Sequence, residues 1–276
     1  MSIQSLPAQA ALTRVWVSGQ GVDAPSCGAL AAPCRQIKYV LDNGLVAPGG
    51  EIDIRDAAGF APFTITQSVS IVNDGAGVAS IQATSTSNAI DIMASQADGI
   101  FLKGLTIDGM GTDAIGIRSL SAGRLVILRC TIKNIRIGIA TSNLVSTARN
   151  LNLKVSDVTI DNVRAGIDFS RNDPAGTVAG EISRVNISNS IIGIAVYSST
   201  SLLTDVTITG STRAGIEIGS QLRDKSTPVV LRRCTITNSA VGVQNWTTMS
   251  SYGDNSIIGN GKDIFDPAAV TRVNTQ

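Results

Sequence analysis

A pentapeptide pattern that recurs six times constrains the fold of this chain more than any other feature. CTIKN (130–134) and CTITN (234–238) are two copies, and LTIDG, VTIDN, VNISN and VTITG are the others. Successive central isoleucines are 25, 28, 27, 21 and 28 residues apart: Ile107, Ile132, Ile160, Ile187, Ile208 and Ile236. A glycine followed by Ile or Val comes after every copy. Two markers that recur together at a spacing in the twenties indicate a repeat array.

Each copy alternates apolar and polar residues, which is typical of a strand with one buried face. Gly, Asn, Ser and Asp separate these strands, and no segment inside the array has helical spacing. The pattern therefore predicts an all-β chain, a right-handed parallel β-helix in which equivalent strands pair about 4.8 Å apart. A slip of one residue would turn the buried residues outward, so equivalent residues of successive turns are expected to form columns.

The four cysteines fall into two groups. Cys130 and Cys234 occupy an apolar position that other turns fill with Leu or Val, so we expect buried free thiols. They lie four turns apart, roughly 19 Å, which is too far for a disulfide. Cys27 and Cys34 lie in a loop rich in Pro, Ala and Gly; they either remain free or form a disulfide, the alternative that we favour. A disulfide would indicate an oxidising compartment.

The N-terminal third differs from the array and predicts a cap. Residues 14–19 have the pattern of a strand, and apolar residues recur at helical spacing within 35–45. A β-helix leaves strand edges at its ends, and an amphipathic helix before the first turn would cover one of them. We predict a disordered segment or signal-peptide remnant at 1–13, a cap at 14–50, the β-helix at 51–265 and a tail at 266–276.

Charge and composition exclude several classes of function. A net charge of +1 without a basic run argues against nucleic-acid binding. No stretch of 18 apolar residues is present, so the sequence predicts no membrane span. The absence of histidine removes His-based acid–base catalysis and most zinc sites. Residues 8–10 (AQA) match the form of a signal-peptidase site, although the usual apolar core before it is missing. Together with the expected disulfide, this match favours an exported protein.

Several longer strings resemble a known family. They are VWVSGQGVDAPSCGALAAPCRQIKYVLD, GGEIDIRDAAGF, ITQSVSIVNDGAG, LKGLTIDGMGTDAIGI and SYGDNSIIGNGKD. These strings are similar to bacterial right-handed parallel β-helix repeat proteins of the pectate-lyase-like superfamily, over about residues 14 to 263. The resemblance implies the fold but no activity, because that superfamily includes polysaccharide lyases, glycoside hydrolases, carbohydrate esterases, phage tailspikes and adhesins. No string here matches the catalytic motifs of its lyases.

Stacking the turns places two carboxylates in one outward column. The residues that directly follow each Gly-Ile or Gly-Val pair are Arg118, Ala140, Asp168, Ala195, Glu217 and Gln244. Because their neighbours on both sides in the strand are apolar, Asp168 and Glu217 should point outward. Two turns give about 9.6 Å between their backbones, near the upper end of the ~6.5–9.5 Å carboxyl separation of inverting glycosidases. Asp168 and Glu217 are therefore a candidate catalytic pair.

Neighbouring residues suggest a binding role for the same face. Arg136, Arg164 and Arg213 form a second column that would suit an acidic sugar, and Tyr197 and Trp246 are nearby aromatic residues for stacking on sugar rings. The alternative, which we favour, is a solvated face whose charges neutralise one another. Asp161, Asp168 and Asp173 cluster in one turn, but neighbouring turns supply no matching carboxylates for Ca²⁺. We predict no metal and no cofactor.

Three functions remain open from the sequence. An exported protein with a surface-binding or structural role is favoured, and binding of polysaccharide along the solenoid is one form that this role could take. A polysaccharide lyase or glycoside hydrolase is the first alternative, although the sequence leans against catalysis. A fibre component of the phage or adhesin type is the second, and it would form a trimer; the oligomeric state is otherwise open.

Overall fold

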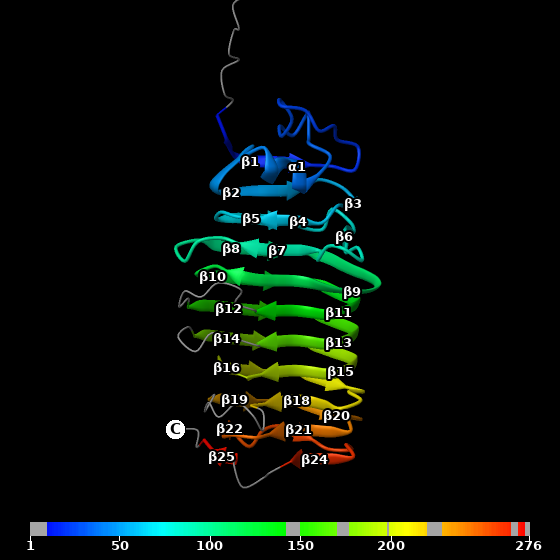
Figure 1. Ribbon diagram of the computed structural model, residues 1–276, viewed down its shortest axis with the longest axis vertical. Coiled ribbons are helices and arrows are strands. Elements are labelled where there is room, and N and C mark those ends of the chain that lie inside the picture. Colours follow the sequence, from blue (N-terminus) through cyan, green and yellow to red (C-terminus); the bar gives the residue numbers. More distant parts are fainter. Residues whose placement is uncertain are drawn as a thin grey trace, which may run out of the picture.

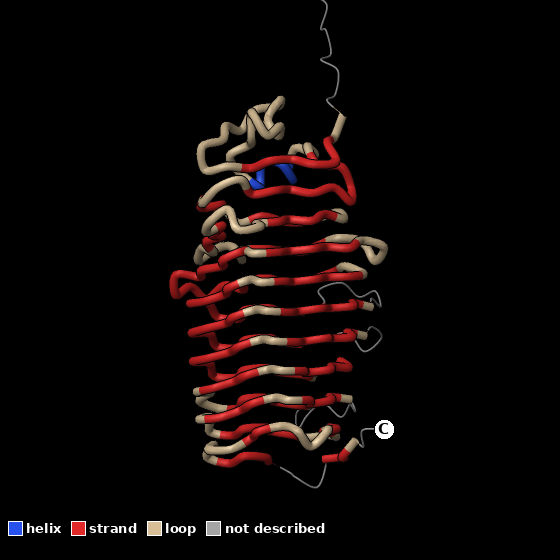
Figure 2. The backbone as a smooth tube through the Cα atoms, turned by 180° about the vertical axis from the view of Figure 1, so that it is seen from behind, coloured by secondary structure: helices blue, strands red, loops and turns tan. Residues whose placement is uncertain are grey.

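Short parallel strands stacked along one axis make up nearly all of the chain (Figures 1 and 2). The computed structural model describes residues 10–141, 150–169, 177–197, 199–219, 228–265 and 270–273. Every strand pair within these residues is parallel, and each strand pairs with its equivalent in the next turn. The structure confirms the predicted parallel β-helix with a short capping helix at its N-terminal end.

One side of the coil is an eleven-stranded sheet. Its strands, in spatial order, are β1 (Leu12–Val17), β2 (Val46–Ile54), β5 (Val69–Val72), β8 (Gly99–Lys103), β10 (Arg124–Leu128), β12 (Leu151–Ser156), β14 (Val178–Ser183), β16 (Ser199–Thr204), β19 (Val229–Arg232), β22 (Met249–Ser251) and β25 (Val270–Arg272).

The other strands form a bent sheet with two ladders. Four long strands run through both: β9 (Leu105–Ser121), β11 (Thr131–Thr141), β13 (Thr159–Phe169) and β15 (Asn186–Val196). Their first halves continue the ladder of β3 (Ala58–Phe60), β6 (Ala79–Gln82), β17 (Thr207–Thr209), β20 (Thr235–Thr237) and β23 (Ser256–Ile257). Their second halves continue the ladder of β4 (Phe63–Ile65), β7 (Ile90–Met93), β18 (Ala214–Ile218), β21 (Val241–Asn245) and β24 (Lys262–Phe265). We call the outer surface of this second ladder the charged face.

The repeated strings lie in register, as the sequence predicts. Ile132 pairs with Ile107 on one side and with Ile160 on the other, and the column continues through Ile187, Ile208 and Ile236. All six side chains are buried in the centre of the coil. Cys130 and Cys234 are buried free thiols in the same core, as expected. Apolar burial along these columns is the main force that holds the turns together.

Each turn has two corners with a left-handed backbone, the first directly before the pentapeptide string, as at Arg129, Asp157, Arg184 and Arg233, and the second at its end. The second corner is occupied by Asn134, Asn162, Asn189, Gly210 and Asn238, whose φ angles lie between 51° and 72°. Asn tolerates this conformation better than other residues with a Cβ, which explains why five of the six strings end in Asn or Gly at this corner. The Asn162 side chain also donates a hydrogen bond of 2.8 Å to the Asn134 amide oxygen.

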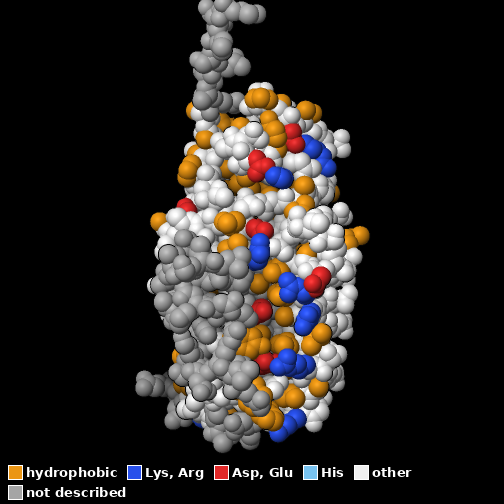
Figure 3. All heavy atoms as spheres, viewed as in Figure 1, with side chains coloured by type: hydrophobic (Ala, Val, Ile, Leu, Met, Phe, Trp, Pro, Cys, Tyr) orange, Lys and Arg blue, Asp and Glu red, His pale blue; other side chains and the backbone are white. Residues whose placement is uncertain are grey.

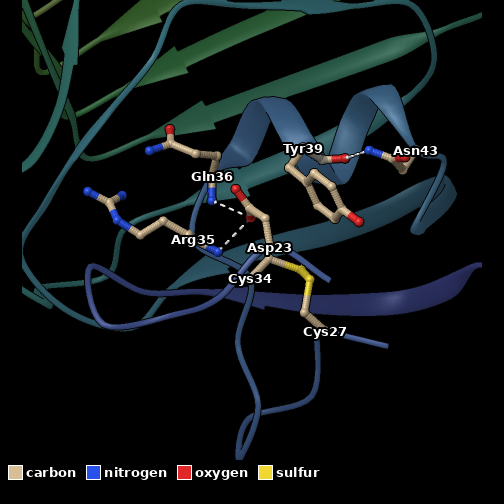
Figure 4. The surroundings of a disulfide bond; sticks show 7 residues. All are labelled: Asp23, Cys27, Cys34, Arg35, Gln36, Tyr39 and Asn43. Carbon is tan, nitrogen blue, oxygen red and sulfur yellow. Dashed lines mark hydrogen bonds between the residues drawn. A yellow bond between two sulfur atoms is a disulfide. The ribbon is translucent and has the colours of Figure 1, made fainter. Parts of the chain in front are cut away.

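The N-terminal cap is smaller than predicted. Helix α1 (Ile37–Asp42) is shorter than the expected 35–45 because Gln36 has an extended backbone, with φ −125° and ψ 135°. Ile37 and Val40 point into the core, and the helix packs against β2 and β4. In the loop before the helix, a disulfide joins Cys27 to Cys34, and Asp23 accepts hydrogen bonds from two backbone N–H groups after the second cysteine (Figure 4).

The coil is longer than predicted at both ends. β1 pairs in parallel with β2, so the strand assigned to the cap is the first strand of the eleven-stranded sheet. β25 pairs with β22, so the coil continues into the segment predicted as a tail. Residues 1–9 of the expected N-terminal segment lie outside the described residues. Within the described part of the chain, no helix has the length and apolar character that crossing a membrane requires.

Candidate functional site

Charged side chains follow one another along the charged face (Figure 3). The predicted column is in register from turn to turn and begins one turn earlier than the sequence indicated, at Asp91 beside Arg118. Its remaining members, in order, are Ala140, Asp168, Ala195, Glu217 and Gln244. The structure therefore brings Asp168 and Glu217 to positions two turns apart, with Ala195 between them.

Glu217 is buried, which corrects the expectation of a solvated face. Ile216 and Ile218 point into the core, so the Glu217 side chain points outward, yet it is only 2% exposed. Its Oε1 accepts hydrogen bonds from the Tyr197 hydroxyl at 2.9 Å and from Arg213 Nη2 at 3.0 Å. Its Oε2 lies 2.9 Å from the same Arg213 nitrogen. Because a buried charge is costly without partners, these contacts explain how a carboxylate is tolerated here.

Tyr197 belongs to the turn between those of the two carboxylates. It comes one residue after Val196, which pairs with Phe169 in the preceding turn and with Ile218 in the following one. The side chain is half-buried, and this burial is the largest factor that raises the pKa of its hydroxyl. The charge of Glu217, the hydrogen bond to it and the charge of Asp168 raise this pKa further, whereas Arg213 lowers it. The phenol is therefore firmly protonated at neutral pH.

The three arginines of the second column have different surroundings. Arg213 binds Glu217 while its side chain remains 54% exposed. Arg136 lies 3.1 Å from an Asp113 carboxylate oxygen and donates to the carbonyl of the same residue. Arg164 is exposed and forms no ion pair with any acidic side chain among the described residues.

A hollow of about 340 Å³ lies where Arg136 and Arg164 meet. Asn134, Asn162 and Ile191 contribute to its walls. It therefore combines two guanidinium groups and two side-chain amides with one apolar side chain that is 42% exposed. Such a mixture of charged, hydrogen-bonding and apolar groups suits a polar organic ligand with an acidic group.

A second hollow, of about 440 Å³, lies on the same face near the cap. Asp91 and Arg118 form a bidentate ion pair at its wall, in which Arg118 Nε lies 2.7 Å from Asp91 Oδ1 and Nη2 lies 2.9 Å from Oδ2. Lys38 of α1 and Phe63 of β4 line it as well, together with the hydroxyl groups of the 85–87 turn. Both hollows therefore open onto the charged face.

Trp246 lies in the turn after Glu217, and its ring packs against another side chain of this chain, so it is not a free surface on which a sugar ring could stack. Its ring packs against Phe265 with centroids 4.9 Å apart, and Lys262 lies over the Phe265 ring. The Trp246 backbone N–H donates to Ile218. Among the aromatic residues predicted to bind sugar, Tyr197 is thus the one in contact with the carboxylate column.

The described residues contain no group of three or more His, Cys, Asp or Glu side chains that could hold a metal ion. Asp161 accepts hydrogen bonds from Ser188 and Asn189 instead. Asp173, which completed the weighed calcium cluster, lies outside the described residues.

Comparisons with known proteins show a similarity of fold to a solved structure and no match in sequence. No protein-family model and no curated protein matches this chain. A similar solved structure is the GH136 lacto-N-biosidase from Eubacterium ramulus, as its selenomethionine derivative, with 10% sequence identity and a TM-score of 0.50. The match covers 94% of this chain and 67% of that one. The likeness is one of fold.

Sequence reasoning missed the partners of the site residues. The Tyr197–Glu217 hydrogen bond joins a residue after one strand to a residue of the next turn, and alternation within strands does not predict it. Asp91 was detectable, because the string AIDIMA aligns its Ile90 with Ile117 of the next turn. Asp113 lies in an insertion within β9, where register shifts hide its neighbours.

Proposed function

We propose that this chain is an exported carbohydrate-binding protein whose charged face holds an extended acidic polysaccharide. The observation that carries the proposal is the hollow between Arg136 and Arg164, because Arg164 lacks an acidic partner among the described residues. An exposed guanidinium beside amide side chains recognises a carboxylate or sulfate through charge-assisted hydrogen bonds. The disulfide between Cys27 and Cys34 supports export, since such bonds persist in oxidising compartments.

The shape of the face supports a linear ligand. The two hollows lie along one ladder, so hydrogen-bonding groups recur at about 4.8 Å intervals in the direction of the long axis. A linear polymer can contact several turns at once, and many weak contacts then add to a useful affinity. The similar structure is described as a lacto-N-biosidase, and together with the resemblance to the pectate-lyase-like superfamily this supports a carbohydrate-related role, not a particular reaction.

Catalysis on a polysaccharide is the second candidate. It is favoured by the two-turn separation of Asp168 and Glu217, which places their backbones about 9.6 Å apart, near the upper end of the ~6.5–9.5 Å carboxyl separation of inverting pairs. The burial of Glu217 counts against direct contact between its carboxylate and a substrate. A fibre component remains a third possibility, and a trimeric mass in solution would distinguish it.

The test is affinity for matched acidic and neutral polysaccharides on an array. We expect binding to acidic polysaccharides that weakens as salt is added. Arg164→Ala should lower that affinity by about tenfold or more, as expected when a hydrogen bond to a charged group is lost. Arg124→Ala is the matched control, because Arg124 is an equally exposed arginine on β10 of the opposite sheet. Equal affinities for the two variants, or no binding of any acidic polysaccharide, would contradict the proposal.

A further inference from the structure

We propose that Tyr197 and Glu217 form a nucleophile and base that hydrolyse glycosides of 2-keto sugar acids, in which the anomeric carbon itself bears a carboxylate. The inference rests on the proposed function, because it names the sugar class and a reaction for the same face. It assigns Glu217 a role that its burial permits. The carboxylate need not touch the sugar, since Tyr197 stands between them.

The hydrogen bond between the two side chains has the arrangement of an activated nucleophile. The Tyr197 hydroxyl donates to Glu217 Oε1 at 2.9 Å, and that carboxylate is 2% exposed. A hydroxyl becomes nucleophilic when an adjacent base takes its proton during attack. Arg213 fixes the base from the other side, with its Nη2 3.0 Å from Oε1 and 2.9 Å from Oε2. The half-buried Tyr197 is the member of this pair that reaches the surface.

Charge selects the sugar. A carboxylate nucleophile would approach a carboxylate-bearing carbon against like-charge repulsion, whereas a neutral phenol would not. Arg213 can hold the sugar's carboxylate, because one of its nitrogens binds Glu217 while the side chain remains 54% exposed. Some of the glycosidases that depart from the usual pair of carboxylates use a tyrosine nucleophile.

Asp168 completes the arrangement as proton donor. It lies in the turn before Tyr197, on the side opposite Glu217, and the carboxylate of a bound sugar would favour the protonated form of its side chain, because like charges repel. In the first step the phenol oxygen bonds to the anomeric carbon and its proton passes to Glu217. The glycosidic C–O bond breaks, and the leaving oxygen takes a proton from the Asp168 carboxylic acid.

Water reverses these roles in the second step. It attacks the anomeric carbon and gives a proton to the Asp168 carboxylate. The bond to Tyr197 breaks, and the phenol regains its proton from Glu217. The net reaction consumes one water and releases the sugar acid and an alcohol with retained configuration, so atoms and charges balance.

The first test is covalent trapping on the full chain. We expect the 2,3-difluoro derivative of N-acetylneuraminic acid to leave an adduct that peptide mapping by mass spectrometry places on Tyr197. The 4-methylumbelliferyl glycoside of the same sugar should be hydrolysed. Tyr197→Phe should abolish both results, and Tyr252→Phe, a tyrosine whose ring instead contacts Arg232, should change neither. Thermal unfolding of each variant checks that it folds.

The second test addresses the base. Glu217→Gln keeps the size of the side chain but cannot accept the proton, so turnover should fall by about 10²-fold or more, while the thermal unfolding temperature shows whether the fold survives. An adduct on another residue, or no adduct at all, would overturn the inference. Acidic polysaccharide that binds without any adduct or turnover would also overturn it and leave the proposed function standing. Equal affinities of the Arg164→Ala and Arg124→Ala variants, or no binding of acidic polysaccharide by the unaltered chain, would instead refute the proposed function.

Discussion

Gly166→Ala tests the stacking of the turns, because this glycine is the invariant part of the second sequence marker. A Cβ atom at Gly166 would lie 2.5 Å from the carbonyl oxygen of Gly193 in the next turn. It would also lie 2.9 and 3.0 Å from two carbon atoms of the Ile187 side chain. A carbon–oxygen contact normally needs about 3.3 Å, so the two backbones would have to separate by roughly 0.8 Å.

The expected cost follows from what obstructs the methyl group. Overpacking costs about 1–3 kcal/mol, and a backbone carbonyl held in a ladder places this site at about 3 kcal/mol. The lower entropy of the unfolded alanine chain offsets about 0.4–1 kcal/mol. The net loss of unfolding free energy is therefore about 2 kcal/mol. With a urea dependence of about 3 kcal/mol per M, the unfolding midpoint should fall by about 0.7 M.

Urea unfolding followed by circular dichroism measures this difference, with Gly99→Ala as the matched control. Gly99 lies in β8, and a Cβ there would meet no atom within 4 Å. The control should therefore unfold at the wild-type urea concentration or slightly above it. If Gly166→Ala unfolds at the same concentration as Gly99→Ala, the close approach of Gly166 and Gly193 is refuted.

Three further predictions concern the charge, disulfide and thiols of the chain. The Ser68 hydroxyl, with further hydrogen bonds, lowers the pKa of Asp98 to about 2. The contribution of Asp98 to stability is therefore complete above its ordinary pKa of 3.8 and is lost as the pH falls toward 2. In Asp98→Asn, the thermal unfolding temperature should depend less on pH between about 4 and 2 than it does in the unaltered chain. Reduction of the Cys27–Cys34 disulfide should lower the unfolding free energy by about 2.5 kcal/mol, from the entropy of an eight-residue loop, and an unchanged urea midpoint would contradict this. Burial raises the pKa of the Cys130 thiol to about 11, so it should resist Ellman's reagent in the native chain and react in urea; equal rates would count against its burial.

The fold was predictable because stacked positions share one environment. Each turn places the same pentapeptide against the same pentapeptide, so an isoleucine such as Ile160 finds Ile132 and Ile187 above and below it. By the same logic, the spacing of the repeats is enough to place Asp168 two turns from Glu217. The first residue of the helix was less predictable. Helix α1 begins only after Gln36, because the backbone of Gln36 is extended, and the spacing of Ile37 and Val40 does not reveal this.

The candidate site was predictable as a column but not as a set of contacts. Alternation gave the outward direction of Glu217, but its burial depends on Tyr197 and Arg213, whose side chains reach across turns. Long side chains have several rotamers, and a column position does not select among them. For the same reason, the sequence did not distinguish Arg164 from Arg136, which binds Asp113.

The register of the turns is tested most directly by a distance between two spin labels. Thr131 and Thr235 are 104 residues apart in sequence and four turns apart in one column, through Thr159, Asn186 and Thr207. Nitroxide labels on cysteines at these two positions, in a chain with valine at 130 and 234, would be measured by pulsed electron paramagnetic resonance. Stacking predicts a narrow distribution centred near 19 Å, roughly four times the strand spacing. A broad distribution centred well beyond that distance would contradict the register on which the charged face and its proposed functions depend.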